Sequence, residues 1–530
     1  MVLGAGVFTH TACAQNGLDV CSSSIDIASL LPGGANVDPD VAATVAEAEA
    51  NFAAALAQVP SAQDLSSQIQ VLGKLALNDP SLSVDNNLAC TFCHRPSAGF
   101  TNGSSFFNQT IVASPGSVPI TNATGDGPNS RIAPRKPQTY GYAPFAPILT
   151  YNATQGDFYG GNFWDMRATG IRLGNPAAEQ AQGPPVNPLE HGFIDTACAV
   201  YRLSLGPYRA FFEQVWGVHS FAIAWPPDVE TVCSTPGPAP ASDPFPVHLN
   251  AVDRATANTT FDHMAMAMAA YEASPEVSAF SSKFDFALAN PHQRVLSKDE
   301  QAGWELFRGK GTCNTCHLDG SANQGQKNGR TSTPTNRAPM FTDFTSSNLG
   351  LPKNVALPYY CETTPDQFGF TANAKGFAYL DAGVGGMLSG PQCPTTDHGH
   401  GIPPQLTSPP ANCNPNASWA AFAPQFDGKF RVPTLRNVDK RPYPTFVKAY
   451  MHHGYLKSLK EVVHFYNTRD ALPSCPQGSP GEKVTCWPPS EIEANKDTTV
   501  GNLRLTEKQE NQIVEFMKTL TDGFTPPATR

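Results

Sequence analysis

The sequence predicts a mainly α-helical protein whose helices are joined by long irregular segments. Helix signals recur along the chain. The 49 prolines and 43 glycines among 530 residues, with only 15% charged residues, indicate a loop-rich globular protein rather than a coiled coil or a helical repeat. The pattern C-x-x-C-H occurs twice, at Cys90–His94 and Cys313–His317. A chain of this length is expected to hold more than one domain, and the repeated pattern suggests two, with one copy in each.

Helices are predicted where apolar residues recur at helical spacing or where a capping sequence is present. The first expected helix is Ala-rich, and the second ends before Pro80, because proline blocks the continuation of a helix. The last two begin with capping boxes at Ser297 and Thr506. The expected helices span residues 41–57, 65–77, 261–273, 297–307 and 506–520.

The segments between the helices are rich in Gly, Pro and small polar residues. We expect residues 100–154 to be loop and the proline-rich residues 222–248 to form an exposed excursion. The expected divisions of the chain are a leader and linker segment at 1–36, a first domain at 37–294, a second domain at 295–530, and a Cys- and Pro-rich insertion at about 352–428.

The repeated C-x-x-C-H pattern is the attachment sequence of c-type haem. Two thiols at this spacing reach both vinyl groups of one porphyrin, and the adjacent imidazole becomes the proximal ligand of the iron. The alternative is a zinc or redox C-x-x-C pair followed by an incidental histidine. We therefore expect two covalently attached haems, bound through thioethers and axial histidines by Cys90, Cys93, His94, Cys313, Cys316 and His317.

Nine cysteines remain, and they indicate an exported protein. Ala12-Cys13-Ala14 looks like the small-residue end of a secretory signal, and cleavage there would leave eight cysteines for disulfides in an oxidising compartment such as the periplasm. No apolar run approaches the roughly 18 residues that a membrane-spanning helix needs. The eight cysteines are Cys21, Cys198, Cys233, Cys361, Cys393, Cys413, Cys475 and Cys486.

Charge excludes one class of partner. The net charge is −10 and the pI about 5.7, and no Lys/Arg run with interleaved aromatics is present, so we expect no nucleic-acid binding. Within the insertion, Asp397-His398-Gly399-His400 is similar to a pair of metal ligands.

Several segments beyond the haem sequences resemble bacterial dihaem cytochrome c peroxidases and their relatives of the MauG type. The resemblance covers residues 65–530 in patches and implies two cytochrome c-like haem domains. The segments that carry it are Leu72-Gly73-Lys74, Asp79-Pro80, Phe163-Trp164-Asp165, Gln180, Glu190, Glu305-Leu306-Phe307, Phe341-Thr342-Asp343-Phe344, Pro433-Thr434-Leu435-Arg436-Asn437, Tyr450-Met451-His452-His453-Gly454 and Leu459 to Tyr466.

The resemblance implies that hydrogen peroxide reacts at the first haem and that the second haem stores or relays electrons. Glu190 matches the distal acid that moves the peroxide proton, and burial is expected to raise its pKa. Trp164 matches the tryptophan between the haems, a relay for electrons or holes. Many family members supply a second axial histidine after the first haem sequence, but none lies here between His94 and His191, so the first haem is expected to be open to peroxide.

Tyr466 stands where peroxidases of the family place a methionine ligand of the second haem. A phenolate oxygen favours ferric and higher oxidation states, whereas methionine raises the potential. The resemblance therefore implies that Tyr466 is the distal ligand of this haem. The alternative is a packed residue on the apolar face of its helix.

The resemblance also implies roles for three arginines and a calcium site. Arg131, Arg167 and Arg436 are candidates for pairing with haem propionates, or equally for ordinary salt bridges. The family's interdomain calcium uses an Asn and a Thr whose counterparts here are Ile132 and Lys440, which puts calcium binding in question.

The sequence is thus interpreted as a peroxide-reactive dihaem oxidoreductase of the MauG type, with a protein substrate as electron donor. Three alternatives stay open. They are a cytochrome c peroxidase that takes electrons from a small cytochrome or cupredoxin, a non-catalytic electron-transfer cytochrome, and a rubber-cleaving dihaem oxygenase.

Overall fold

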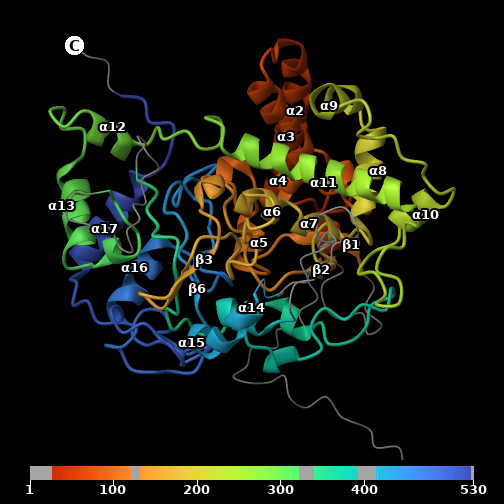
Figure 1. Ribbon diagram of the computed structural model, residues 1–530. Coiled ribbons are helices and arrows are strands. Elements are labelled where there is room, and N and C mark those ends of the chain that lie inside the picture. Colours follow the sequence, from red (N-terminus) through yellow and green to blue (C-terminus); the bar gives the residue numbers. More distant parts are fainter. Residues whose placement is uncertain (1–26, 121–129, 321–338, 392–413, 415, 527–530) are drawn as a thin grey trace, which may run out of the picture.

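The computed structural model describes residues 27–120, 130–320, 339–391, 414 and 416–526, and these are mainly helical (Figure 1). The strands form short antiparallel pairs, β1 (Pro115–Pro119) with β2 (Ser130–Ile132), β3 (Thr150–Asn152) with β4 (Asp157–Tyr159), and β5 (Ser346–Ser347) with β6 (Phe430–Arg431). The helices are α1 (Ile27–Leu30), α2 (Pro39–Gln58), α3 (Leu65–Leu77), α4 (Cys90–Cys93), α5 (Ser105–Gln109), α6 (Pro176–Ala181), α7 (Gly183–Val186), α8 (Thr196–Leu205), α9 (Arg209–Trp216), α10 (Val229–Cys233), α11 (Ala251–Glu272), α12 (Lys283–Ala289), α13 (Lys298–Arg308), α14 (Gly383–Ser389), α15 (Ala423–Phe426), α16 (Leu459–Thr468) and α17 (Glu507–Lys518).

The larger apolar core, here called the first core, surrounds α3, α8 and α11. Apolar faces of these helices pack together, with Leu72 and Leu75 of α3 almost fully buried. Helix α3 approaches α11 closely at Gly73, where a Cβ atom would overlap the carbonyl of Ala267. Glycine thus permits the close crossing. Cys90 of the first haem sequence packs against this core.

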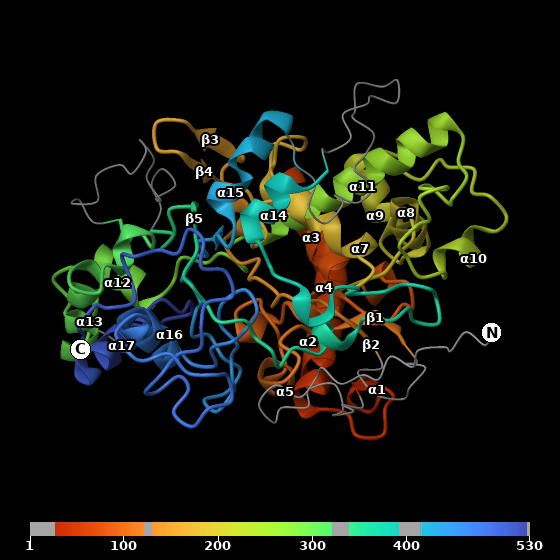
Figure 2. The same ribbon diagram turned by 90° about the horizontal axis from the view of Figure 1, so that it is seen from below.

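A second core lies among α13, α16 and α17. Phe307, Ile513 and Phe516 are almost completely buried in it. Gly303 of α13 has the same role as the glycine of α3, because a Cβ there would overlap the carbonyl of Gln512. Cys313 of the second haem sequence packs against this core. In both views the three helices gather at one end of the molecule, away from α3 and α11 (Figures 1 and 2).

The predicted helices are confirmed, with one change of length. Helix α3 has the predicted bounds, and α13 and α17 begin with the capping boxes of Ser297 and Thr506. Helix α11 starts earlier than predicted, at Ala251, because the Asn250 side chain accepts hydrogen bonds from the next backbone N–H groups and caps the helix there.

Two predictions about irregular segments were wrong in part. Residues 100–154 contain α5 and strands β1 to β3, because short pairings satisfy backbone groups that loop would leave to water. Residues 222–248 do not form a free excursion. They contain α10, whose Cys233 is fully buried and disulfide-bonded to Cys198 of α8.

The insertion at about 352–428 packs across the molecule. Its helices α14 and α15 bury Val384, Met387 and Phe426 against Phe158 of β4, and they lie between the two cores in both views (Figures 1 and 2). Arg135 joins the insertion to the first half of the chain, since its guanidinium contacts Asp165 at 2.6 Å and Asp381 at 2.7 Å. The insertion therefore fastens segments that lie far apart in the sequence.

Disulfides confirm part of the cysteine prediction. Cys198 pairs with Cys233 and Cys475 with Cys486, and Cys361 is also disulfide-bonded. Cys21, Cys393 and Cys413 lie outside the described residues, as does the His398–His400 segment. None of the helices in the described part of the chain combines the length and hydrophobicity needed to cross a bilayer.

Candidate active site

Both C-x-x-C-H sequences place cysteine thiols beside a core. Cys90 and Cys93 lie at the two ends of α4, and Cys313 begins a short 3₁₀ turn that ends before Cys316. These four cysteines form no disulfide, whereas the other cysteines of the described residues do. The cysteines of the C-x-x-C-H sequences are thus available for attachment of a cofactor, whereas the other described cysteines cross-link the chain.

The two adjacent histidines are oriented in the same way. His94 Nδ1 lies 3.1 Å from the carbonyl oxygen of Phe100, and His317 Nδ1 lies 2.9 Å from that of Phe341. A carbonyl can only accept, so each Nδ1 carries the proton and each Nε2 keeps its lone pair. Burial lowers the pKa of His94 to about 4 and also lowers the pKa of His317, so both rings are neutral at neutral pH. A neutral Nε2 is the form that ligates iron.

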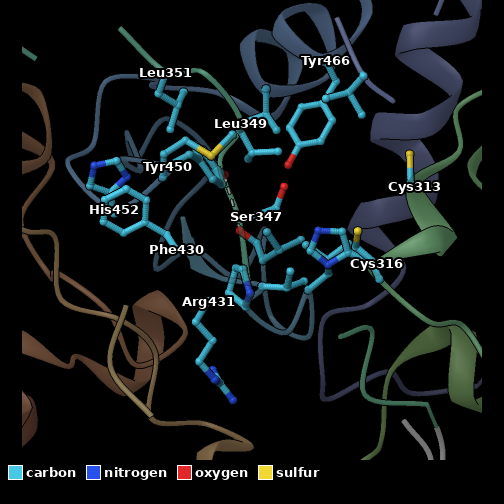
Figure 3. A pocket seen from close by; sticks show the side chains of 18 of the residues that line it. Cys313, Cys316, Ser347, Leu349, Leu351, Phe430, Arg431, Tyr450, His452 and Tyr466 are labelled. Carbon is cyan, nitrogen blue, oxygen red and sulfur yellow. Dashed lines mark hydrogen bonds between the residues drawn. The ribbon is translucent and has the colours of Figure 1, made fainter. Parts of the chain in front are cut away.

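A cavity of about 210 Å³ opens beside the second sequence (Figure 3). Leucine and valine side chains supply part of its lining, among them Leu349, Leu351 and Val463. Tyr466 of α16 directs its hydroxyl into the cavity, across from Cys313 and Cys316 (Figure 3). Burial raises the pKa of this phenol above its usual value.

Basic side chains meet the same cavity. Lys136, Lys448 and Arg431 line it, and Arg431 Nε is buried without a hydrogen-bond partner in the described residues. Burial lowers the pKa of Arg431 to about 10 and that of Lys136 to about 7. Sequence reasoning missed these residues, because single basic residues in loops carry no local signal. Apolar walls, two cysteine thiols, a bare imidazole nitrogen and the unpaired Nε of Arg431 together fit a haem with its propionates.

Trp164 lies between the two haem sequences. Its ring lines the cavity, and its Nε1–H donates to the carbonyl of Lys136 at 2.9 Å. Lys136 is close enough to His94 for its charge to add to the effect of burial on the pKa of that ring. The indole therefore lies at the cavity beside Cys313 and Cys316 and is linked through Lys136 to the surroundings of His94.

Glu190 lies beside the first haem sequence. Its backbone carbonyl accepts from Ser117 of β1 at 2.7 Å, and its Oε1 accepts from the Asn187 side chain at 2.6 Å. Burial raises its pKa, opposed by the charge of Arg167 and the hydrogen bond of Asn187. The pKa of the Cys93 thiol is raised mainly by burial and, to a smaller extent, by the negative charge of Glu190. A buried carboxyl with a raised pKa is suited to proton transfer.

Each arginine of the predicted set meets a carboxylate of the protein, which is the second of the two alternatives for these residues. Of the three, Arg436 also lines the cavity. The pairs are Arg131 with Asp366, Arg167 with Asp165 and Arg436 with Asp285, each at 2.8 Å.

Three other positions from the sequence analysis have defined surroundings. His191, next to Glu190, directs its Nδ1 at the carbonyl of Leu82 at 2.6 Å. At the two family calcium positions, Ile132 is fully buried in an apolar cluster and the Lys440 ammonium lies 5.6 Å from the centre of the Phe100 ring.

Comparison with known proteins places the chain. Residues 67–293 match the family described as di-haem cytochrome c peroxidase. The methylamine utilization protein MauG of Paracoccus denitrificans is 26% identical over 457 residues, covering 86% of this chain and 88% of that protein. A cytochrome-c peroxidase of Denitromonas iodatirespirans is 23% identical over 477 residues, covering 87% and 84% respectively.

A solved structure shares the fold. The diheme peroxidase BthA of Burkholderia thailandensis superposes with a TM-score of 0.55 at 22% identity, covering 87% of this chain and 88% of that one. Sequence and fold agree with the two haem sequences and the cavity described above. The chain is therefore similar over most of its length to MauG and to cytochrome-c peroxidase, its residues 67–293 match the di-haem cytochrome c peroxidase family, and it is a dihaem peroxidase-type oxidoreductase.

Proposed function

We propose that this enzyme binds two covalent haems c and uses them to oxidise a protein substrate with hydrogen peroxide. His94 and His317 are the proximal ligands, and the paired cysteines form the thioethers. When bound, the haems supply the redox chemistry, in which one peroxide and two protons take up two electrons and leave as two waters. The protein's own residues bind and orient these groups, move the protons and connect the two sites.

Glu190 is the proton carrier of the first site. A peroxide must lose a proton from one oxygen and gain it on the other for the O–O bond to break. Burial raises the pKa of this carboxyl and so favours its protonated form more than in water, and the hydrogen bond from Asn187 holds it in one orientation. Both features support its assignment as the general acid–base.

Tyr466 is the residue that favours a MauG-type function over that of a cytochrome c peroxidase. Its hydroxyl points into the cavity opposite the second pair of cysteines (Figure 3), at the place where the family's peroxidases have methionine. Burial favours the neutral phenol, so the phenolate requires a ferric ion to hold its oxygen. An anionic oxygen ligand lowers the potential and favours an oxidised second site over a reduced electron store.

Trp164 connects the sites. The indole lines the cavity beside Cys313 and Cys316, and its N–H donates a hydrogen bond to the backbone carbonyl of Lys136, which lies near His94. We assign it the transfer of electrons from the second site to the first, the direction needed when peroxide is reduced at the first site.

The proposed location is the periplasm or another exported compartment. The disulfides described above suit an oxidising environment, and they close loops around both cores. The proposed electron donor is a protein whose side chain is oxidised, since a low-potential second site is a poor acceptor from a small cytochrome.

The test starts from the all-ferric holoenzyme. One equivalent of peroxide is added anaerobically, with and without prior one-electron reduction, and the Soret band and the EPR spectrum are followed. We expect one high-spin haem at rest and a prompt reaction without reduction. A requirement for reduction would instead identify a cytochrome c peroxidase. A fully low-spin, inert protein would identify an electron carrier, and oxygen uptake with polyisoprene would identify a rubber oxygenase.

A further inference from the structure

Three side chains outside the two haem sequences bring metal-ligating atoms together. His452 and His453 come from the turn that precedes α16, and Glu491 comes from the segment between α16 and α17. One ligand atom of each lies within 4.8 Å of the ligand atoms of the others. Both imidazoles are buried, with exposed fractions of 4% and 3%. None of these residues is used in the proposed peroxide reaction.

His453 has the hydrogen-bonding pattern of a metal ligand. Its Nε2 lies 2.9 Å from the carbonyl oxygen of Pro352, and a carbonyl can only accept, so Nε2 carries the proton. Its Nδ1 then has a bare lone pair, and this atom is buried without a hydrogen-bond partner in the described residues. Histidines that ligate metals commonly donate their other N–H to a backbone carbonyl in this way.

His452 offers the second nitrogen. Its Nε2 is also buried without a partner among the described residues. The ring is held in place by Phe430, which stacks on it with ring centres 3.5 Å apart and planes 11° apart. The His452 and His453 rings lie 4.0 Å apart, and His452 lies at the side of the cavity away from Cys313 and Cys316 (Figure 3).

Glu491 is the carboxylate of the group, and the nearby cations are engaged elsewhere. Arg135 is bound by Asp165 and Asp381. Lys353 donates to the carbonyls of Phe377 and Tyr379, both at 2.5 Å. Glu491 Oε1 accepts only a long hydrogen bond of 3.3 Å, from the Asp381 N–H, and no ion pair of Glu491 is found in the described part of the chain.

We propose that His452, His453 and Glu491 bind one divalent first-row transition-metal ion of the zinc type, separate from both haem irons. Two imidazole nitrogens and one carboxylate oxygen form a donor set used for such ions, and three protein ligands leave a position for water. The site draws its ligands from two segments that flank α16, so a bound ion also ties these segments together.

The experiment measures zinc on the haem-loaded protein. The holoenzyme is treated with a chelator, given Zn²⁺ and assayed by elemental analysis and by competition with a coloured chelator. One zinc per chain is expected. Glu491→Gln and His453→Gln are expected to weaken zinc binding at least about tenfold, because each removes a direct ligand and even outer partners of a ligand are worth that much.

Matched variants remove a histidine elsewhere. His464→Gln and the double change His398→Gln with His400→Gln are expected to bind zinc as the wild type does, and haem content checks that every variant is folded. X-ray absorption at the zinc edge of the wild type gives an answer that needs no variant, with two imidazoles and one carboxylate expected. Absence of stoichiometric zinc, equal binding in all variants, or loss only in the His398/His400 variant would overturn the inference.

Discussion

At the scale of single residues, His94 and His317 are each oriented by one backbone carbonyl. The residues that supply these carbonyls, Phe100 and Phe341, both have positive φ, at 61° and 51°. This conformation costs a non-glycine residue roughly 1–2 kcal/mol. In both places the strained residue is the Phe of a Phe-Thr pair, Phe100-Thr101 and Phe341-Thr342. The carbonyl of this Phe orients the imidazole in each case.

Glu190→Gln removes the proposed proton carrier and leaves the side-chain shape. We expect the peroxide reaction to slow by about two to four orders of magnitude, the usual effect of a positioned general acid–base. The wild-type rate should rise with pH through the raised pKa of Glu190, because only the ionised carboxylate can accept the peroxide proton. Stopped-flow absorbance of the Soret band between pH 4 and 9 measures both effects, and the variant should lose the pH-dependent limb.

Glu272→Gln is the matched control. Glu272 is another buried carboxyl near Cys90, and burial raises its pKa well above the usual value, which favours the neutral form that glutamine resembles. This variant should react with peroxide at the wild-type rate. If the peroxide reaction were slowed equally in Glu190→Gln and Glu272→Gln, Glu190 would not be the specific proton carrier.

Tyr466→Met tests the distal ligand of the second haem. Replacing an anionic oxygen by a thioether should raise the reduction potential of that haem, while peroxide binding at the first haem is unchanged. Potentiometric titration of the holoenzyme measures the shift. Tyr450→Phe, which changes another tyrosine of the cavity whose hydroxyl contacts Arg441, should leave the potential near the wild-type value. Equal potentials in the Met variant and the wild type would show that Tyr466 is only a packed residue.

At the scale of elements, α16 and α17 are joined by one buried carboxylate. Glu510 of α17 accepts from His464 at 2.9 Å and pairs with Lys460 at 2.8 Å, both from α16. Burial alone would raise the pKa of Glu510, but these hydrogen bonds outweigh it and lower the value to about 2. The hydrogen bond to Glu510 raises the pKa of His464 in return. These contacts of Glu510 hold α16, the helix that carries Tyr466, against α17.

His464→Gln should make the stability of the protein less dependent on pH. Because folding raises the pKa of His464, its charged contribution is fully present below its ordinary value of about 6.5 and is lost as the pH rises through the folded value. The variant should therefore be less stable than the wild type at pH 5.5, by about 1 kcal/mol, and nearly equal at pH 8.5. Urea unfolding at the two pH values measures this, and a difference that grew with pH would contradict it.

At the scale of the whole molecule, the Arg135 guanidinium helps to fasten the insertion to the rest. Asp165 is completely buried under Arg135, and Asp381 of the insertion is 7% exposed. The Arg167 guanidinium also contacts Asp165, so two cations and two carboxylates form one network beside Trp164. Through it the insertion positions the segment that separates the two haem sequences.

Arg135→Ala should destabilise the fold by about 3–5 kcal/mol, because it leaves the buried Asp381 carboxylate without its ion-pair partner and Asp165 with Arg167 alone. The change in the free energy of urea unfolding, followed by circular dichroism, measures the effect. Arg209→Ala is the control, since its pair with Glu213 is 47% exposed on the arginine side and should change stability by no more than about 0.5 kcal/mol. A small effect in both variants would show that the insertion is held by its apolar contacts alone.

The whole chain should hold two haems through thioethers. Acid–acetone extraction should leave all colour on the protein, and the pyridine haemochrome assay should give two haems per chain. Cys313→Ala with Cys316→Ala should retain one. Extraction of haem from the wild type would show that at least one site binds without covalent attachment.

The sequence by itself determined the features that depend on neighbouring residues. The spacing in Cys90–His94 and Cys313–His317, the bounds of α3 and the capping boxes of α13 and α17 were all predicted, because each arises within a few residues of chain. The resemblance added Glu190, Trp164 and Tyr466, whose roles stay predictions.

Only the tertiary structure decided which distant segments meet. The ion-pair partner of Arg131 is Asp366 of the insertion, 235 residues away in the sequence. His452 and His453 precede α16 in the sequence and Glu491 follows it, yet the three side chains meet. No local pattern encodes such pairs, because they depend on how loops of uncertain length close around the cores. The burial that shifts the pKa of Glu190 and orphans the imidazole nitrogens likewise exists only once the chain is packed.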